Sequence, residues 1–255
     1  MAAQHHSHST LLQAVAEVAE LAGATAFEHY RQDVAVDRKG DGSPVTIADR
    51  EAERRARDWI ARHFPGDAVL GEEFGTEAGT TGRTWLIDPI DGTKTFVRGV
   101  PLWGSLVAVV QHAAVLAGAA TFPAVGEELA AAPGEGCWHN GARCRVSEVA
   151  ALAEATLLSS EIPEHPQSRQ RWDALARRAG IVRTWGDCYG YLLVATGRAE
   201  AMIDPRLNPW DIACFVPIVS EAGGVLTDFS GATSWNLKDA IATNAALAAE
   251  VRRVY

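Results

Sequence analysis

The chain has 255 residues, of which 47% are hydrophobic and 22% are charged, and these values are ordinary for a globular protein with a core of its own. Its formal net charge of −9 disfavours sequence-independent binding to nucleic acid, which requires a basic face. The cysteines form no CxxC pair and no zinc-finger spacing, so we expect free thiols at Cys137, Cys144, Cys188 and Cys214.

The sequence shows neither a membrane span nor a secretory leader. No apolar run approaches the roughly 20 residues that a membrane-spanning helix requires. Residues 1–10, MAAQHHSHST, lack the basic segment and the apolar segment of a secretory signal. We therefore expect a cytoplasmic protein that does not associate with membranes.

The chain opens with two helical patterns. Apolar residues recur at helical spacing over residues 11–31, which predicts a helix. Residues 39–45, KGDGSPV, predict a turn, and a second helix is expected to begin at Thr46 and stop at Pro65. Next come a short buried strand over residues 68–75, which carries acids at its end, and a strand over residues 84–87 that ends at Asp88.

From residue 102 onward the periodicity becomes that of a sheet, and it changes again near residue 147. Strands are predicted over residues 105–111, 113–122 and 127–133, with a tight hairpin turn at Asn140-Gly141. Later strands, 155–160, 181–185, 199–204, 225–228 and 240–243, alternate with helices, 169–180, 189–197, 209–224 and a last one to Tyr255. This alternation predicts helices layered on sheets, with an α+β half over residues 1–147 and an α/β half over residues 148–255.

Carboxylates recur near the ends of apolar segments, at Glu72, Asp88, Asp91 and Asp211. An acid at the end of one strand is ordinary, because strand ends reach solvent. Asp88 and Asp91, however, flank a turn stiffened by Pro89, so both side chains can point to one side. Their repulsion would raise a pKa unless a cation neutralised them, and hard oxygen ligands suit magnesium. The motif therefore predicts a magnesium site, and an Asx-type turn is the structural alternative.

The residues that follow Asp91 suggest a phosphate-binding turn. Gly92 lets the backbone approach a ligand closely. Thr93 and Lys94 can open a helix or turn whose amides face an anion. We therefore expect a phosphate group beside the predicted metal site.

Three motifs, GEEFG, WLIDPIDGTKTFVRGVP and NPWDIACFVPIVSEAGG, resemble the signatures of the inositol monophosphatase superfamily of magnesium-dependent phosphatases. The resemblance implies that superfamily's sugar-phosphatase fold, a layered sandwich of helices and sheets, and a homodimer. It also implies two or three magnesium ions per site. The metal ligands that it implies are Glu72, Asp88, Asp91, Asp211 and the backbone carbonyl of Ile90.

The resemblance further implies catalytic roles for Thr93, Asp49 and Glu72. Thr93 would position a water molecule, with Asp49 hydrogen-bonded behind it. The spacing Thr46-x-x-Asp49 is also that of a capping box, so a structural role for Asp49 stays open. Asp211 lies in the first turn of its predicted helix, where capping alone would explain it, although the complete motif favours metal ligation.

The substrate is expected to contact both halves of the chain, at Asp91, Gly92, Thr93, Lys94, Asp187, Asp204 and Asp211. Carboxylates accept hydrogen bonds from inositol hydroxyls, but they suit a cationic ammonium or imidazolium better. The strings GDCYGYLLVATG and DGTKTFVRGVP look most like the histidinol-phosphatase branch. The resemblance therefore implies a small phosphorylated metabolite, L-histidinol phosphate of histidine biosynthesis, as the substrate.

Other functions stay open. Inositol 1-phosphate is the second candidate, since members of the superfamily overlap in substrate, and sugar bisphosphates such as fructose 1,6-bisphosphate and adenosine 3′,5′-bisphosphate come next. Asp204 departs from the glutamate that many relatives carry there. A catalytically inactive relative that only binds a cation or ligand is the non-enzyme alternative, and the presence of both Thr93 and Asp49 argues against it, because a cation site needs neither.

Overall fold

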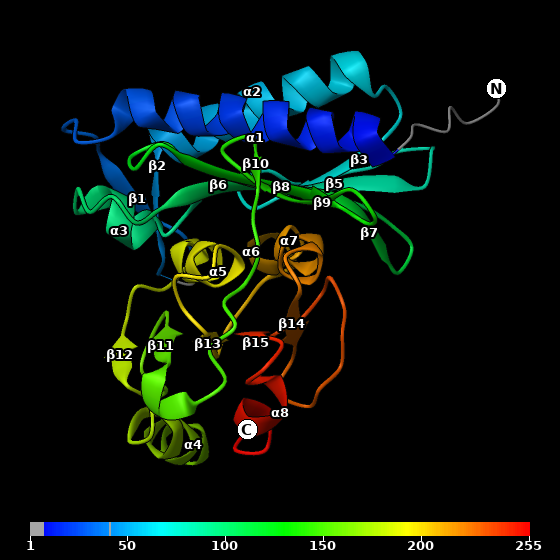
Figure 1. The fold of residues 1–255 in the computed structure, drawn as a ribbon. Helices are drawn as coiled ribbons and strands as arrows, with labels where there is room; N and C mark the ends of the chain where they lie inside the picture. The colour runs from blue at the N-terminus through cyan, green and yellow to red at the C-terminus, as the bar shows by residue number, and fades with distance from the viewer. Residues whose placement is uncertain (1–7, 41) are drawn as a thin grey trace.

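The computed structural model describes residues 8–40 and 42–255. Helices and sheets alternate in layers (Figure 1), which confirms the predicted layered sandwich. The helices of the outer layer are α1 (His8–His29) and α2 (Ile47–His63). Between the two large sheets lie α5 (Cys188–Ala195), α6 (Pro209–Ile212) and α7 (Phe215–Glu221). Beyond the second sheet lie α4 (Pro166–Ala176) and α8 (Ala248–Arg252).

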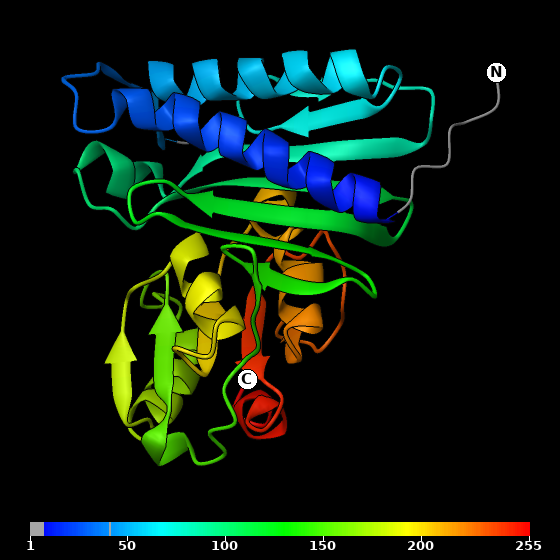
Figure 2. The ribbon, with the colours of Figure 1, turned by 45° about the horizontal axis from the view of Figure 1, so that its top comes forward.

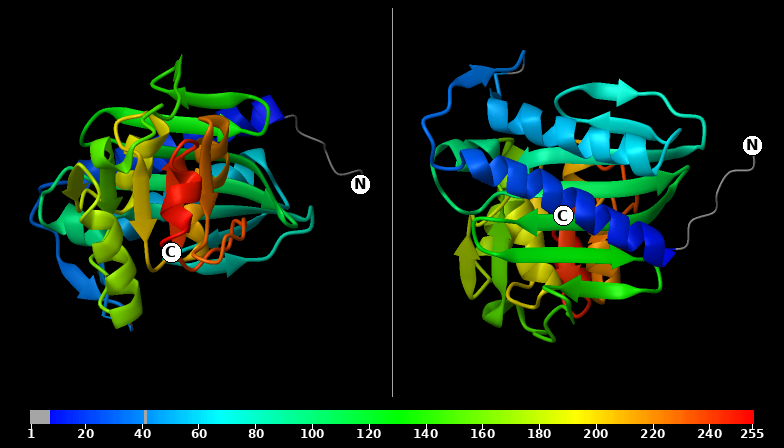
Figure 3. Two further views of the ribbon diagram at one scale, coloured as in Figure 1. Left: turned by 60° about the horizontal axis from the view of Figure 1, so that its bottom comes forward. Right: turned by 90° about the horizontal axis from the view of Figure 1, so that it is seen from above.

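The first large sheet has eight strands in the order β10-β9-β8-β7-β6-β5-β3-β4, and α1 and α2 cross one of its faces (Figure 3, right). β3 and β5 pair in parallel, and the other neighbours pair antiparallel. The strands are β3 (Ala68–Gly71), β4 (Gly75–Glu77), β5 (Arg83–Asp91), β6 (Gly104–Gln111), β7 (Ala114–Phe122), β8 (Glu127–Ala132), β9 (Gly136–His139) and β10 (Ala142–Arg143). Asn140 and Gly141 adopt positive φ in the two-residue turn, as predicted for the hairpin.

The second large sheet has five strands in the order β12-β11-β13-β15-β14. The strands are β11 (Thr156–Ser159), β12 (Ile181–Arg183), β13 (Ala201–Asp204), β14 (Gly224–Thr227) and β15 (Ala240–Asn244). Figure 2 shows this sheet beneath the first one, with α5 and α7 between them. A short 3-10 helix, η1 (Leu152–Glu154), precedes β11 and was not predicted.

The turn predicted over residues 39–45 lies in a small hairpin, and its last two residues, Pro44 and Val45, belong to the second strand. The strands of this hairpin, β1 (Val36–Arg38) and β2 (Pro44–Thr46), pair antiparallel in a two-stranded sheet. Thr46 then caps α2, so the predicted start of that helix is confirmed. The hairpin places Lys39 in its loop, where the side chain reaches the end of β3.

The single helix predicted over residues 209–224 is wrong, because the structure breaks it into α6 and α7. Pro217 has no N–H to donate to the carbonyl of Ala213, and its ring crowds that carbonyl. Val216 donates to the Ala213 carbonyl instead, in a tighter turn. The interruption leaves Asp211 on a short helix of its own, which faces β5.

The strand predicted over residues 68–75 is shorter than expected. β3 ends at Gly71, and β4 runs back along it from Gly75, where φ is positive. Glu72 and Glu73 therefore lie in the turn between these strands rather than on a strand end. The strand predicted over residues 84–87 is longer than expected, because β5 continues to Asp91.

The two halves of the chain share buried side chains. Leu86 and Leu106 of the first sheet belong to the same buried apolar cluster as Tyr191 of α5 and Phe215 of α7. Among the described residues, no helix is long and apolar enough to cross a membrane. The expectation about a secretory leader rested mainly on residues 1–7, which lie outside the described ranges.

Candidate active site

The end of β5 directs two carboxylates to one side of the sheet. Residues three apart on a regular strand face opposite sides, but the pairing of β5 with β6 shifts register between Asp88 and Asp91. The Ile90 N–H donates to Asp88 Oδ1 at 3.0 Å, which fixes the turn within this irregular stretch. Asp88, Asp91 and Asp211 offer oxygens that all lie within 4.8 Å of one another.

Asp211 reaches this cluster from α6, on the other side of the site. Pro209 occupies the first turn of α6, and Asn208 caps the helix. The Asn208 N–H donates to Asp211 Oδ2 at 2.7 Å, so Asp211 takes part in a capping box as well as in the acidic cluster. Burial above all, together with the Glu72 charge, raises the pKa of Asp211 to about 7, although the Asn208 hydrogen bond opposes this rise.

Burial and, after it, mutual repulsion raise the pKa values of the carboxylates in the cluster. Burial raises the pKa of Asp88 well above its usual value, and the charges of Glu72, Asp91 and Asp211 add to this effect. Burial likewise raises the pKa of Asp91, together with the charges of Asp187 and Asp211, while a hydrogen bond from the Cys188 N–H opposes the rise. Oxygen ligands that repel one another at this spacing fit a hard divalent cation such as magnesium.

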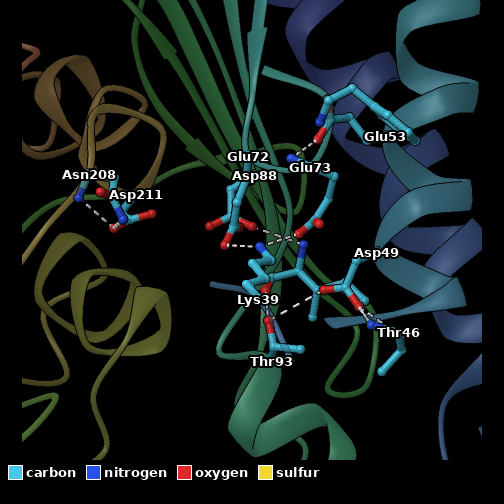
Figure 4. A network of polar contacts seen from close by, with 12 residues as sticks. Lys39, Thr46, Asp49, Glu53, Glu72, Glu73, Asp88, Thr93, Asn208 and Asp211 are labelled. Carbon is cyan, nitrogen blue, oxygen red and sulfur yellow. Dashed lines mark hydrogen bonds and ion pairs between the residues drawn. The ribbon is translucent and has the colours of Figure 1, made fainter. Parts of the chain in front are cut away.

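Glu72 borders the cluster and is held by a lysine that the sequence analysis did not single out. Lys39 Nζ donates to Glu72 Oε1 at 2.7 Å and to Glu73 Oε1 at 2.5 Å (Figure 4). Burial alone would lower the pKa of Lys39, but these contacts with Glu72 and Glu73 raise it overall. Burial also raises the pKa of Glu73 to about 7, so this residue is not a simple surface acid.

The turn that carries Glu72 is anchored by a buried carboxylate on α2. The Glu53 side chain is fully buried and accepts hydrogen bonds from the N–H groups of Glu73, at 2.7 Å, and Phe74, at 3.3 Å. Arg57 Nε donates to Glu53 Oε1 at 2.8 Å and balances its charge. A Cβ at Gly71 would lie 2.0 Å from a Glu53 oxygen, so the close approach of helix and turn requires glycine there.

Thr93 and Asp49 are brought together as the resemblance implied. Thr93 begins α3 (Thr93–Val97), and its hydroxyl lies 3.0 Å from the Ile90 carbonyl and 3.4 Å from Asp49 Oδ1. The other oxygen, Asp49 Oδ2, accepts from the Thr46 N–H at 2.8 Å and from its hydroxyl at 2.7 Å. Asp49 therefore caps α2 with one oxygen and faces Thr93 with the other. Its burial raises its pKa, although the Thr46 hydrogen bonds oppose this.

Two further acids lie beside the cluster, on the second half of the chain. Asp187 caps α5 with φ 49° and ψ −154°, a backbone conformation that residues other than glycine rarely adopt. Asp187 Oδ2 lies 3.3 Å from the position of a Cβ on Gly92, which φ of 83° also reserves for glycine. Asp204 ends β13 and accepts a hydrogen bond from Ser160 at 2.7 Å. Burial raises the pKa of Asp187, and the charge of the exposed Lys94 opposes this rise.

Sequence reasoning missed Lys39 and Glu53, although both contact the turn that bears Glu72. Lys39 was part of a stretch interpreted only as a turn. Glu53 and Arg57 have the i, i+4 spacing of an exposed helical ion pair, which is the ordinary interpretation of such residues. No signal in the sequence indicated that this pair is buried against another segment.

The fold and this acidic site define a class of protein. The sequence profile of the inositol monophosphatase family matches residues 7–254. The chain therefore belongs to the inositol monophosphatase family, whose members are magnesium-dependent phosphatases that hydrolyse phosphate monoesters.

Individual proteins are similar to this chain over most of its length. The chain is 44% identical over 227 residues to a histidinol-phosphatase of Chlorobaculum parvum, which covers 88% of this chain and 87% of the relative. It is 40% identical to a histidinol-phosphatase of Mycobacterium tuberculosis, over 96% of this chain and 97% of the relative. Among solved structures, an IMPase of Thermotoga maritima superposes with a TM-score of 0.86 at 34% identity and covers 96% of each chain.

Proposed function

We propose that this chain hydrolyses L-histidinol phosphate to L-histidinol and phosphate in the presence of magnesium. The observation that carries the choice of substrate is the pair of acids, Asp187 and Asp204, beside the cluster of Asp88, Asp91 and Asp211. The beginning of α5 connects the two groups of acids, because the Cys188 N–H donates to Asp91 and the Tyr191 hydroxyl lies 3.4 Å from Asp204. The names of the two histidinol-phosphatase relatives agree with this proposal.

In this proposal the metal ligands are Glu72, Asp88, Asp91, Asp211 and the carbonyl of Ile90. Bound magnesium supplies the positive charge that activates a water molecule and stabilises the leaving ester oxygen. Asp49 accepts from the Thr93 hydroxyl and so orients it toward that water, with Glu72 beside them. The N–H groups at Gly92 and Thr93 hold the phosphoryl oxygens, and Lys94 adds positive charge near them. The number of ions is proposed to be two or three.

The acids at the other end of the proposed site suit a substrate that carries a cation. Burial above all, together with the Asp187 charge, raises the pKa of Asp204 to about 7, against the opposing effect of the Ser160 hydrogen bond. An ammonium group between the two carboxylates would relieve their repulsion and form charge-assisted hydrogen bonds with both. L-histidinol phosphate carries such an ammonium group, and inositol phosphates do not.

Inositol 1-phosphate is the second candidate substrate. The partly exposed Ser160 hydroxyl lies 2.7 Å from Asp204, so the same wall offers a neutral polar group to a sugar alcohol. The likeness to the IMPase of Thermotoga maritima supports this alternative. A catalytically inactive cation-binding protein is disfavoured by the contact between Thr93 and Asp49, which such a protein would not need.

Phosphate release from a panel of monoesters, with and without magnesium, tests the proposal. We expect kcat/KM for L-histidinol phosphate to exceed that for inositol 1-phosphate by at least about tenfold, which corresponds to ~1.4 kcal/mol. Asp187→Asn should reduce this preference, while Asp173→Asn on the exposed face of α4 should preserve it. An equal or reversed preference in the unmodified protein would refute the choice of substrate, and no release from any ester would refute the enzyme.

The family resemblance also leads us to propose a homodimer located in the cytoplasm. Size-exclusion chromatography with light scattering measures the mass of the assembly against the 27.2 kDa of one chain. A mass of one chain at micromolar concentration would contradict the dimer.

A further inference from the structure

Two cysteines face each other at the open end of the β9–β10 hairpin. Ala142 pairs with His139, and Arg143 pairs with Trp138. The Cys144 N–H donates to the Cys137 carbonyl at 3.1 Å, which extends this pairing by one residue. Directly opposed residues of an antiparallel pair point to the same face, so the two thiols meet, and their Sγ atoms lie 3.3 Å apart.

The two thiols differ in their exposure to solvent and in the direction in which their surroundings shift the pKa. Cys137 is buried, whereas Cys144 is partly exposed and can meet a small solute. The hydrogen bond with Cys137 lowers the pKa of Cys144, against the effect of burial, and the charge of Arg198 lowers it further. The same hydrogen bond raises the pKa of Cys137, and burial raises it further. Cys144 is the thiol that a solute can reach, and its lowered pKa agrees with a role as the nucleophile of the pair.

We propose that Cys137 and Cys144 form a reversible dithiol–disulfide site whose oxidant is a hydroperoxide. The Cys144 thiolate attacks the terminal oxygen of the peroxide, which breaks the O–O bond and leaves a sulfenic acid and, after proton uptake, an alcohol or water. The Cys137 sulfur then attacks the Cys144 sulfur, the S–S bond forms, and the hydroxyl leaves as water with the proton of Cys137. In sum, two thiols and one hydroperoxide give one disulfide, one alcohol and one water. Two molecules of a small thiol then reduce the protein disulfide by exchange and leave joined as their own disulfide.

The position of this site determines what the disulfide changes. β10 is an edge strand, and the chain leaves it after Cys144 to run toward the second sheet (Figure 2). Val146 N–H donates to the Ala222 carbonyl at the end of α7, so the segment is already held on its far side. The disulfide joins the edge strand to its neighbour where the first sheet ends. The loop that it closes is short, so the disulfide restricts the unfolded chain less than one that closes a long loop.

The other cysteines provide matched controls within the chain. Cys188 and Cys214 are both buried, and burial raises the pKa of each thiol well above its usual value. Neither is expected to react with a hydroperoxide in the folded protein. The proposal thus assigns oxidation to one pair among four cysteines.

Peptide mapping tests the proposal directly, because trypsin cleaves after Arg143 and separates the two cysteines. The folded, reduced full chain is treated with hydrogen peroxide, remaining thiols are blocked, and the protein is digested without reductant. We expect peptide 99–143 to remain joined to the dipeptide 144–145, and a reducing agent to release it. Cys144→Ser should abolish the joined species, and Cys214→Ser should leave it unchanged; thermal melts check that both variants are folded.

Three results would overturn the assignment. The first is full oxidation of the unmodified chain without the joined peptides. The second is a sulfinic acid at Cys144 in their place, and the third is a disulfide between two copies of the chain. Because the mapping does not measure phosphate release, its outcome is independent of the proposed enzymatic function.

Discussion

Buried carboxylates near the two ends of β5 have opposite electrostatic environments. At the beginning of the strand, the fully buried Asp67 side chain accepts hydrogen bonds from Arg83 at 2.9 Å, Thr81 at 2.5 Å and Trp85 at 3.0 Å. At its end, Asp88 and Asp91 receive hydrogen bonds from backbone N–H groups and face other acids. Residues at the beginning of β5 thus neutralise a carboxylate that precedes β3, whereas the end of β5 carries two acids of a cluster of negative charge.

The carboxylate near the beginning of β5 has a structural role, whereas the acids at its end form the proposed functional site. A buried charge is tolerated when a partner of opposite charge and hydrogen bonds compensate for its lost hydration. Arg83 provides this for Asp67 within the chain. The arrangement of the acids near Asp88 fits an external cation that would provide it, and the Lys39 ammonium group donates to Glu72 and Glu73 at the margin of the cluster.

The largest expected effect comes from removing a charge at the acidic end. Asp88→Asn should lower kcat/KM for phosphate release by more than about 10,000-fold, or ~5.4 kcal/mol, because the proposed metal site would lose a charged ligand. In the absence of metal, the variant should melt at a higher temperature than the unmodified protein, since one repulsive charge is gone. Phosphate assays and thermal melts measure both. A variant that kept its activity would place the metal elsewhere.

Removing the charge of Asp67, near the beginning of β5, should reduce stability without reducing magnesium affinity. Asp67→Asn leaves the Arg83 guanidinium buried without its counter-charge, which costs about 3–5 kcal/mol of unfolding free energy. Magnesium affinity should stay unchanged, because Asp67 lies at the far end of β5. Denaturant unfolding and isothermal titration calorimetry separate the two quantities. Equal losses of stability and of magnesium affinity would contradict the distinction between the ends.

The difference between the two ends also explains what the sequence revealed. Asp88 and Asp91 were found because their motif is contiguous, so one turn brings them together. Asp211 was found because it belongs to a second specific motif. Glu53 was missed because its role depends on α2 packing against the turn after β3, a contact between segments that no local pattern encodes.

The wrong prediction of a single helix over residues 209–224 has a different origin. Pro217 was visible within the pattern predicted as one long helix, and a proline inside a helix removes a hydrogen bond and interrupts it. Apolar periodicity was given more weight than this signal. The layer order, in contrast, followed from the alternation of elements, because each apolar face needs a partner layer.

The acidic end should make stability depend on both pH and magnesium. The raised pKa values of Asp204 and Asp211, each about 7, mean that the folded protein holds protons more tightly than the unfolded chain. The stability associated with these groups is present below the unfolded pKa, about 3.9, and is lost as pH rises through about 7. The metal-free protein should therefore melt at a lower temperature at about pH 8 than at about pH 5.5.

Magnesium should offset this loss. At 100 times its dissociation constant, it should add about 2.7 kcal/mol to the unfolding free energy. At about pH 8 it should thus raise the melting temperature, and at lower pH the gain should be smaller because protons compete for the same carboxylates. Calcium-free buffers with chelator provide the reference. A melting temperature independent of magnesium at both pH values would contradict cation binding at this end.

The smallest effect sharpens the comparison at the margin of the cluster, where Glu53 contacts no proposed ligand atom but fixes the turn that bears one. Glu53→Gln keeps the size of the side chain and removes its charge, so its hydrogen bonds to the N–H groups of Glu73 and Phe74 weaken. Partners that orient metal ligands typically contribute 10–100-fold to affinity, so magnesium should bind about 10–100-fold more weakly. Glu51→Gln, on the same helix but paired with His29 and Arg55 nearer the surface, is the matched control. Isothermal titration calorimetry measures affinity, and a melt without metal measures folding. A purely structural role for Glu53 would lower the melting temperature but leave the magnesium affinity of the folded protein intact. Unchanged magnesium binding by Glu53→Gln would therefore show that this carboxylate, like Asp67, has a structural role alone.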